Sequence, residues 1–206
     1  MSAFSRWFRL QPSSTRDTSS KARERRLADL EAAAEGAPLG YQGTPLNRAG
    51  DLCLKEGDHE RALAYYGRAI DTFLEDGQPE AARGVANKII RIHPEAVRTL
   101  CTLTWLDLAA GHMATALMHL GDYKDSALRA GQESLAAEQI LAMARSLTQT
   151  EFIDSAADAL DQLGFPDEAA QARKWGKTGG SPQSLVEPEE LSAHCIAAAV
   201  GSIERD

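Results

Sequence analysis

The stretch "LNRAGDLCLKEGDHERALAYYGRAID", residues 46–71, places apolar and small residues at helical spacing on both sides of Gly57. Glycine suits a tight turn because it adopts a positive φ without steric cost. Asp58 follows it directly and is placed to cap a second helix. The stretch therefore predicts two helices joined by a short turn.

Two small residues in this stretch indicate how the helices pack. Gly50 in the first helix and Ala62 in the second lack bulk, so the two backbones can approach closely there. Leu46 and Tyr66 lie one turn away and are predicted to fill the adjoining space. On this interpretation Cys53 occupies an inward position as a small apolar side chain.

Turn glycines recur along the chain. Their spacings are 20, 34, 20 and 33 residues, for Gly57, Gly77, Gly111, Gly131 and Gly164. Because the spacings alternate, a unit of 54 residues is predicted to repeat, which is typical of stacked supersecondary units. The alternative is that the glycines end unrelated helices of similar length. We expect helices at residues 22–35, 45–56, 59–76, 79–92, 95–110, 112–129, 132–147, 151–163, 166–175 and 188–200.

Residues 46–71 resemble a tetratricopeptide repeat, a helix–turn–helix unit, through Leu46, Ala49 and Gly50 and then "EGDHERALAYYGRAI". The resemblance is moderate over 100–123 and partial over 77–94 and 153–173. It implies an all-α, TPR-like α-α superhelix, a helical-repeat solenoid, with flexible N- and C-terminal arms. The 20-residue steps depart from the family's pattern.

Charge and composition divide the chain. The expected divisions are a basic flexible arm with a short aromatic segment (1–20), a helix and linker (21–43), the repeat domain (44–176), and a linker with a short amphipathic helix (177–206). Residues 1–27 carry a net charge of +5 and the remainder −13, within a total of −8. An acidic body is a poor match for nucleic acid, so that partner class is not expected.

No pattern typical of catalysis is present. Cys53 and His59 could form a nucleophile pair, but Cys53 is expected to face inward. His112 and His119 lack further metal ligands and are interpreted as solvent-exposed or capping residues. "GKTGGS" at 176–181 lacks the spacing of a phosphate-binding loop. We therefore expect no enzyme activity, no cofactor and no metal.

The first candidate partner-binding site lies on the predicted helix 95–110. If the first helix of each pair lines a concave surface, as the resemblance implies, then Arg98, Thr102 and Trp105 are presented there. An accessible Trp beside an Arg is a good anchor for a partner. The alternative is that Trp105 is buried between helices.

The second candidate is an acidic row formed by Asp154, Asp158 and Asp161, at spacings of four and three residues. Like charges placed so close destabilise a helix, and a basic ligand would relieve the repulsion. The alternative is a solvated face.

The third candidate is the N-terminal arm. A helical turn there would present the aromatic side chains of Phe4, Trp7 and Phe8 between Arg6 and Arg9. Such a segment can dock in a partner's groove or bind an anionic membrane surface weakly.

The sequence thus predicts a non-enzymatic scaffold or adaptor that binds another protein or peptide. The alternative is a structural subunit of a larger, membrane-associated or soluble, multiprotein assembly that docks through its terminal arms. No apolar run approaches the ~18 residues of a membrane span, and the three cysteines are widely spaced. We therefore expect a cytoplasmic protein, peripheral at the inner face of a membrane if the arm binds lipid.

Overall fold

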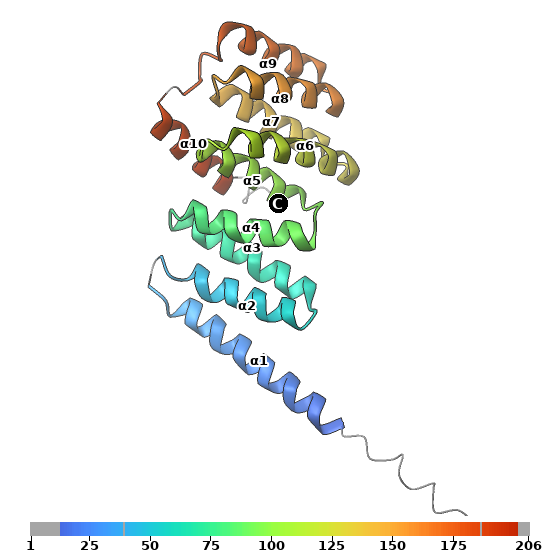
Figure 1. The fold of residues 1–206 in the computed structure, drawn as a ribbon, viewed down its shortest axis with the longest axis vertical. Coiled ribbons are helices and arrows are strands. Elements are labelled where there is room, and N and C mark those ends of the chain that lie inside the picture. Colours follow the sequence, from blue (N-terminus) through green and yellow to red (C-terminus); the bar gives the residue numbers. More distant parts are fainter. Residues whose placement is uncertain (1–12, 39, 186, 202–206) are drawn as a thin grey trace, which may run out of the picture.

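The computed structural model describes residues 13–38, 40–185 and 187–201, and these residues form ten α-helices and no strand. Each helix packs against its neighbours in the chain (Figure 1). The predicted all-α fold is confirmed. The helices are α1 (Ser13–Glu35), α2 (Gly43–Lys55), α3 (His59–Glu75), α4 (Pro79–Ile92), α5 (Val97–Ala109), α6 (Met113–Ala130), α7 (Glu133–Ser146), α8 (Thr150–Leu163), α9 (Pro166–Thr178) and α10 (Pro188–Gly201).

The 54-residue spacing reappears in the backbone hydrogen bonds of three turns. The amide of Asp58 donates to the carbonyl of Cys53 at 3.0 Å, and 54 residues later the amide of His112 donates to Asp107 at 2.8 Å. Phe165 and Leu160 repeat the bond at 2.9 Å. The glycine that precedes each donor has a positive φ. These turns join α2 to α3, α5 to α6 and α8 to α9, an arrangement compatible with a helical repeat.

The same three pairs make the most extensive helix–helix contacts, and α4 and α7 follow the first two pairs as third helices. The predicted close approach is confirmed in the first pair. A Cβ on Gly50 would lie 2.6 Å from the Tyr66 ring, and Ala62 is fully buried. Leu46 and Tyr66 are buried beside them. Small residues therefore set the distance between α2 and α3.

Two predicted boundaries are wrong. Helix α1 begins at Ser13, whereas residues 11–22 were expected to be a linker and the helix to begin near 21. No Gly or Pro interrupts residues 13–35, so the helix extends although its first turns have no apolar periodicity. Helix α9 ends at Thr178, past the predicted end at 175, because Gly179 and not Gly176 has the positive φ that terminates it.

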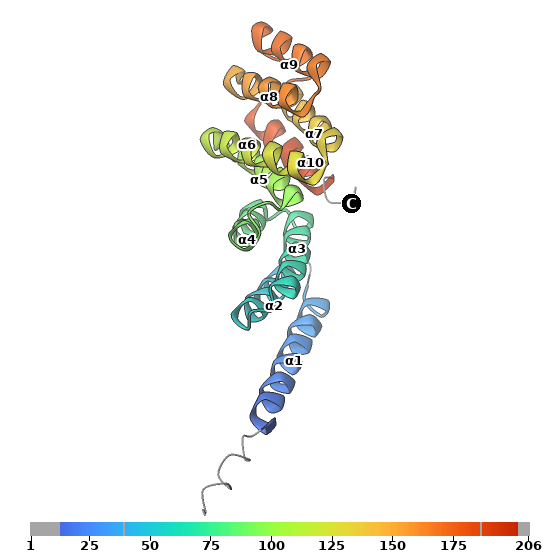
Figure 2. The same cartoon turned by 90° about the vertical axis from the view of Figure 1, so that its right-hand side faces the viewer.

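The C-terminal segment returns to the middle of the molecule. Residues 179–187, which we call the strap, lead from α9 to α10, and α10 lies beside α5 and contacts α3 (Figures 1 and 2). In the described part of the chain, no helix has both the length and the apolar character needed to cross a membrane.

Candidate functional site

Arg98 and Thr102 line a cavity of about 200 Å³ between α3, α4 and α5. The guanidinium Nη2 of Arg98 lies 3.3 Å from Oδ1 of Asp71 on α3. Burial raises the pKa of Asp71 above its ordinary value, and the Arg98 charge opposes that rise. Thr102 is buried and donates its hydroxyl to the carbonyl of Arg98 at 3.1 Å. These two residues of the predicted site therefore share one partly apolar cavity.

Trp105, the third residue of that site, is only 1% exposed. Its Nε1 donates to Oε1 of Gln139 on α7 at 3.1 Å. The ring of His194 on α10 meets it edge-on, with centroids 6.0 Å apart and an interplanar angle of 73°. Of the two sequence interpretations of Trp105, the structure shows the buried one. What covers the tryptophan is the chain's own C-terminal helix.

Helix α10 contacts the body through small side chains. Cys195 and Ala199, four residues apart, are fully buried, whereas Leu191 and Ile196 are half-buried. Burial raises the pKa of the Cys195 thiol to about 12, so the thiol is unreactive while α10 is docked. Nε2 of His194 lies 3.0 Å from Oγ of Ser146, which links α10 to the end of α7.

The strap completes the C-terminus of α7. The last carbonyls of a helix have no partner within the helix. Here Ser181 Oγ donates to the carbonyl of Arg145 at 2.7 Å, Ser184 Oγ to that of Leu147 at 2.7 Å, and the amide of Leu185 to that of Ser146 at 3.0 Å. The segment predicted as a linker is therefore held to the body before α10 begins.

The acidic row of α8 has a partner within the chain. Arg173 on α9 places Nη2 2.9 Å from Oδ1 of Asp158 and 2.5 Å from Oδ2 of Asp161. Asp154 also faces α9, since a Cβ on Gly176 would lie 2.7 Å from its Oδ1. The basic group that the row was expected to attract is thus present as Arg173.

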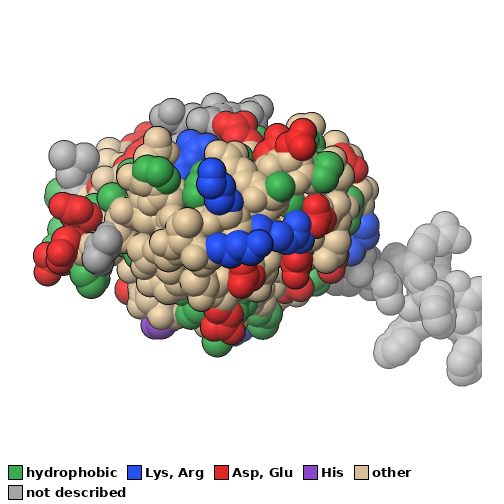
Figure 3. All heavy atoms as spheres, turned by 90° about the horizontal axis from the view of Figure 1, so that it is seen from above, with side chains coloured by type: hydrophobic (Ala, Val, Ile, Leu, Met, Phe, Trp, Pro, Cys, Tyr) green, Lys and Arg blue, Asp and Glu red, His purple; other side chains and the backbone are tan. Residues whose placement is uncertain are grey.

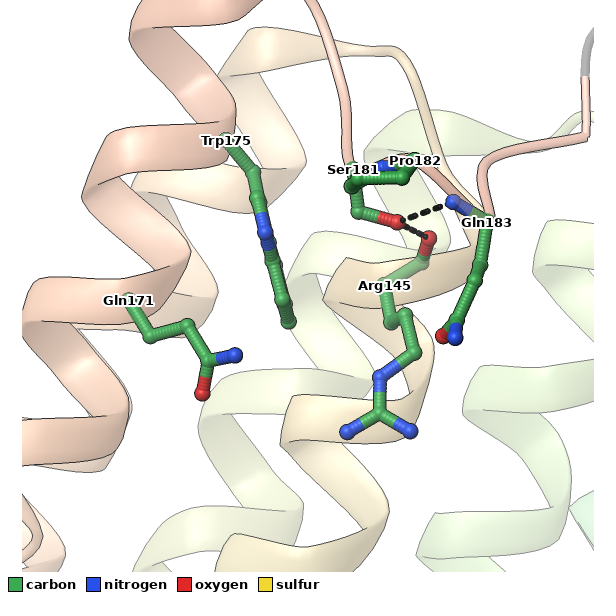
Figure 4. A pocket seen from close by; sticks show the side chains of 6 residues that line it. All are labelled: Arg145, Gln171, Trp175, Ser181, Pro182 and Gln183. Carbon is green, nitrogen blue, oxygen red and sulfur yellow. Dashed lines mark hydrogen bonds between the residues drawn. The ribbon is translucent and has the colours of Figure 1, made fainter.

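A second hollow, of about 360 Å³, lies between the ends of α7 and α9 and the strap. Cζ of Arg145 is 5.9 Å from the centroid of the Trp175 ring. Arg145 lies between this ring and the side chain of Gln183, and Gln171 lines the hollow from α9 (Figure 4). Lys and Arg side chains form a band among acidic neighbours at this end of the molecule (Figure 3). The hollow offers a cation beside an aromatic face, a combination that the sequence did not indicate.

A buried polar cluster was also missed. Asp107 is 1% exposed, and its Oδ2 lies 2.7 Å from Nδ1 of His119. Nη1 of Arg83 on α4 lies 3.5 Å from its Oδ1. His112 is exposed at the first turn of α6, as predicted, but His119 is 7% exposed, so its placement at the surface was wrong. The cluster holds α4, α5 and α6 together.

The predicted arm contacts Phe4, Arg6, Trp7, Phe8 and Arg9 lie outside the described residues. Within the described ranges, no group of three or more His, Cys, Asp or Glu side chains is arranged to hold a metal ion. The C-terminal residues that the sequence did assign to a short helix, 188–200, coincide with α10.

The chain was compared with protein-family models, curated proteins and solved structures, and none of them matches it. A proposal about its function therefore depends on the geometry of its own residues, above all on α5 and the helix that covers it.

Proposed function

We propose that the protein is a non-enzymatic scaffold or adaptor, built on tetratricopeptide-like helical repeats, that binds another protein through one face of α5. We call this surface the α5 face and define it by Cys101, Trp105 and Leu108, with Arg98 and Thr102 at its edge. The observation that carries the proposal is that a helix, α10, already lies on this face and buries Trp105. Docking of a helix into an apolar groove is a recurring mode of protein recognition.

The test is affinity capture from the native host followed by mass spectrometry. We compare the full-length chain, an Arg98→Ala variant and a chain without residues 1–20. If the α5 face is the binding surface, Arg98→Ala depletes the captured partners and the deletion does not. A matched control, Arg91→Ala, changes an exposed arginine of α4 that does not line the cavity. Equal capture by all four proteins would remove the α5 face from consideration.

A second candidate function is that of a structural subunit which docks through its terminal segments. It is favoured by α1, whose first turns project beyond the body (Figure 1). Lys21, Arg25 and Arg26 on α1 are exposed, and its surroundings in the sequence are basic. In the same capture experiment, loss of partners on deletion of residues 1–20, with Arg98→Ala unaffected, supports this function.

A further inference from the structure

Three equivalent helices of the chain differ in one row of side chains. The row on α5 is Cys101, Trp105 and Leu108. The residues 54 positions earlier on α2 are Asn47, Asp51 and Leu54, and those 53 positions later on α8 are Asp154, Asp158 and Asp161.

The polar rows on α2 and α8 are satisfied within their own units. Asp51 accepts from the Tyr66 hydroxyl at 2.6 Å and from Lys88, and Arg173 serves the row on α8. Only the α5 row is largely apolar, and α5 is buried at every position from 100 to 108. A helix that is apolar on all sides needs cover on all sides. Helix α10 provides that cover, so the α5 face is specialised to receive a helix.

The contact that α10 makes is incomplete. Its two fully buried residues are Cys195 and Ala199, and its larger apolar side chains, Leu191 and Ile196, remain half-buried. Because hydrophobic stabilisation follows the apolar area removed from water, this helix gains less than one that also buries its larger residues. The small pair at i and i+4 defines what fits: a helix that approaches α5 closely along a line of small side chains.

The attachment of α10 has two separate parts. The strap is bound to the α7 carbonyls through Ser181, Ser184 and Leu185, and none of these bonds involves α10. Helix α10 can therefore leave the α5 face while the strap stays in place. A tether of this length holds the helix at an effective concentration on the order of millimolar, so docked α10 competes strongly with a free partner.

From these observations we propose that α10 is an exchangeable occupant of the α5 face, and that the partner for this face is a helix with small residues at two positions four apart, which replaces α10. The inference rests on the proposed function and adds the chemistry of the partner and its control by the C-terminus. The surface is closed in the free protein and opens when the partner helix displaces α10.

The test uses the pure full-length protein and a labelled synthetic peptide of residues 187–201 that carries Cys195→Ala. Ala199→Asp in the protein places a charge in the buried contact and releases α10, whereas Ala197→Asp makes the same change at an exposed position of the same helix. We expect the peptide to bind the Ala199→Asp protein about tenfold or more tightly than the wild type or Ala197→Asp, because the tethered competitor is removed. A peptide that itself carries Ala199→Asp should not bind.

A second readout is the reaction of Cys195 with a thiol reagent, assigned by peptide mass mapping. Release of α10 should expose Cys195 and leave Cys53, buried between α2 and α3, at its wild-type rate. Saturating peptide should likewise accelerate the reaction of Cys195 in the wild-type protein. If Cys53 also reacts rapidly in Ala199→Asp, that variant has unfolded more widely, and His194→Ala, which removes the Ser146 contact, takes its place.

Equal peptide affinity in all the proteins, or an exposed Cys195 without peptide binding, would overturn the exchange. Both measurements use purified protein, so their failure is distinct from a failure of the proposed function, which is judged by the effect of Arg98→Ala on captured partners. Exchange without capture supports the inference and contradicts the function; capture without exchange does the reverse.

Discussion

The α2/α3 and α5/α6 hairpins share a backbone but fill one position in opposite ways. Cys53 and Tyr65 in the first hairpin correspond to Asp107 and His119 in the second, 54 residues later. All four side chains are buried. The first pair packs without charge, whereas Asp107 is a carboxylate that pairs with His119 and with Arg83 from the preceding unit.

This difference shows that one turn geometry tolerates two kinds of interior. A buried carboxylate costs desolvation energy and is stable only with its partners in place. In return, Arg83 connects α4 to α5, a junction with less extensive contact than the hairpins themselves. The second hairpin is therefore tied to its neighbour by a polar cluster, while the first relies on packing.

The largest expected effect is that of Asp107→Ala. It removes the partner of buried His119 and of Arg83, so we expect a loss of about 3–5 kcal/mol in the free energy of unfolding. The corresponding change in the first hairpin, Cys53→Ala, should cost about 1 kcal/mol, the typical value for a point change. Urea denaturation followed by circular dichroism measures both. Equal losses would contradict the difference between the hairpins.

The double variant Asp107→Cys with His119→Tyr sharpens this prediction by placing the first hairpin's pair in the second. Replacement of a buried ion pair by apolar residues is often neutral, so stability should return most of the way to the wild-type value. If the double variant is as unstable as Asp107→Ala, the two interiors differ in shape as well as in charge.

Gly50→Ala tests the close contact that belongs to the first hairpin alone. The added Cβ would meet the Tyr66 ring at 2.6 Å, so we expect a loss of about 1–3 kcal/mol from overpacking. The second hairpin holds Thr104 and Leu120 at the corresponding positions. The matched control is Gly84→Ala on the exposed side of α4, where nothing lies within 4 Å. It should gain about 0.5–1 kcal/mol because Ala favours a helix over Gly.

The caps of the second helices give a smaller contrast. Asp58 accepts a hydrogen bond from the amide of Arg61 at 3.3 Å, whereas the corresponding His112 makes no side-chain cap bond. Asp58→Ala should therefore cost about 1 kcal/mol and His112→Ala less. Thermal unfolding monitored at the helical signal distinguishes the two. A larger loss for His112→Ala would assign stability to its contact with Arg83.

The smallest effect concerns the exposed contact of α1 with the first hairpin. Hydrogen bonds from Arg61 and Arg23 lower the pKa of Glu24 from its ordinary 4.5 to about 2. A carboxylate with a lowered pKa contributes stability above its ordinary pKa, and that contribution is lost as the pH falls toward the folded value. NMR titration of the Glu24 carboxyl should show a midpoint near 2, and Arg61→Ala should raise it. An unchanged midpoint would mean that Arg61 does not hold α1 in solution.

The helices and their turns could be predicted because their signals are local. Gly57, Gly111 and Gly164 mark the turns, and the Gly50–Tyr66 contact follows from helical spacing within one hairpin. The start of α1 was missed because its first turns are polar and show no periodicity. Helical spacing alone cannot indicate a helix that has no apolar face.

The candidate site could be predicted only in part. Arg98, Thr102 and Trp105 were identified as one surface, but what covers Trp105 lies 89 residues further along the chain, at His194. The partner of the acidic row, Arg173, and the polar cluster at Asp107 depend in the same way on contacts between helices. No pattern within one helix specifies which residue of another helix it meets.

The sequence by itself determined that the chain is all-α, where its turns lie and that its units are 54 residues apart, because glycine, helical spacing and small residues act over a few neighbours. The tertiary structure alone decided that α10 returns to α5, that Asp107 is buried with its partners, and that Arg145 lies beside Trp175. These contacts join segments far apart in the chain, and they form where apolar surface and unpaired polar groups left by the helices can be satisfied together.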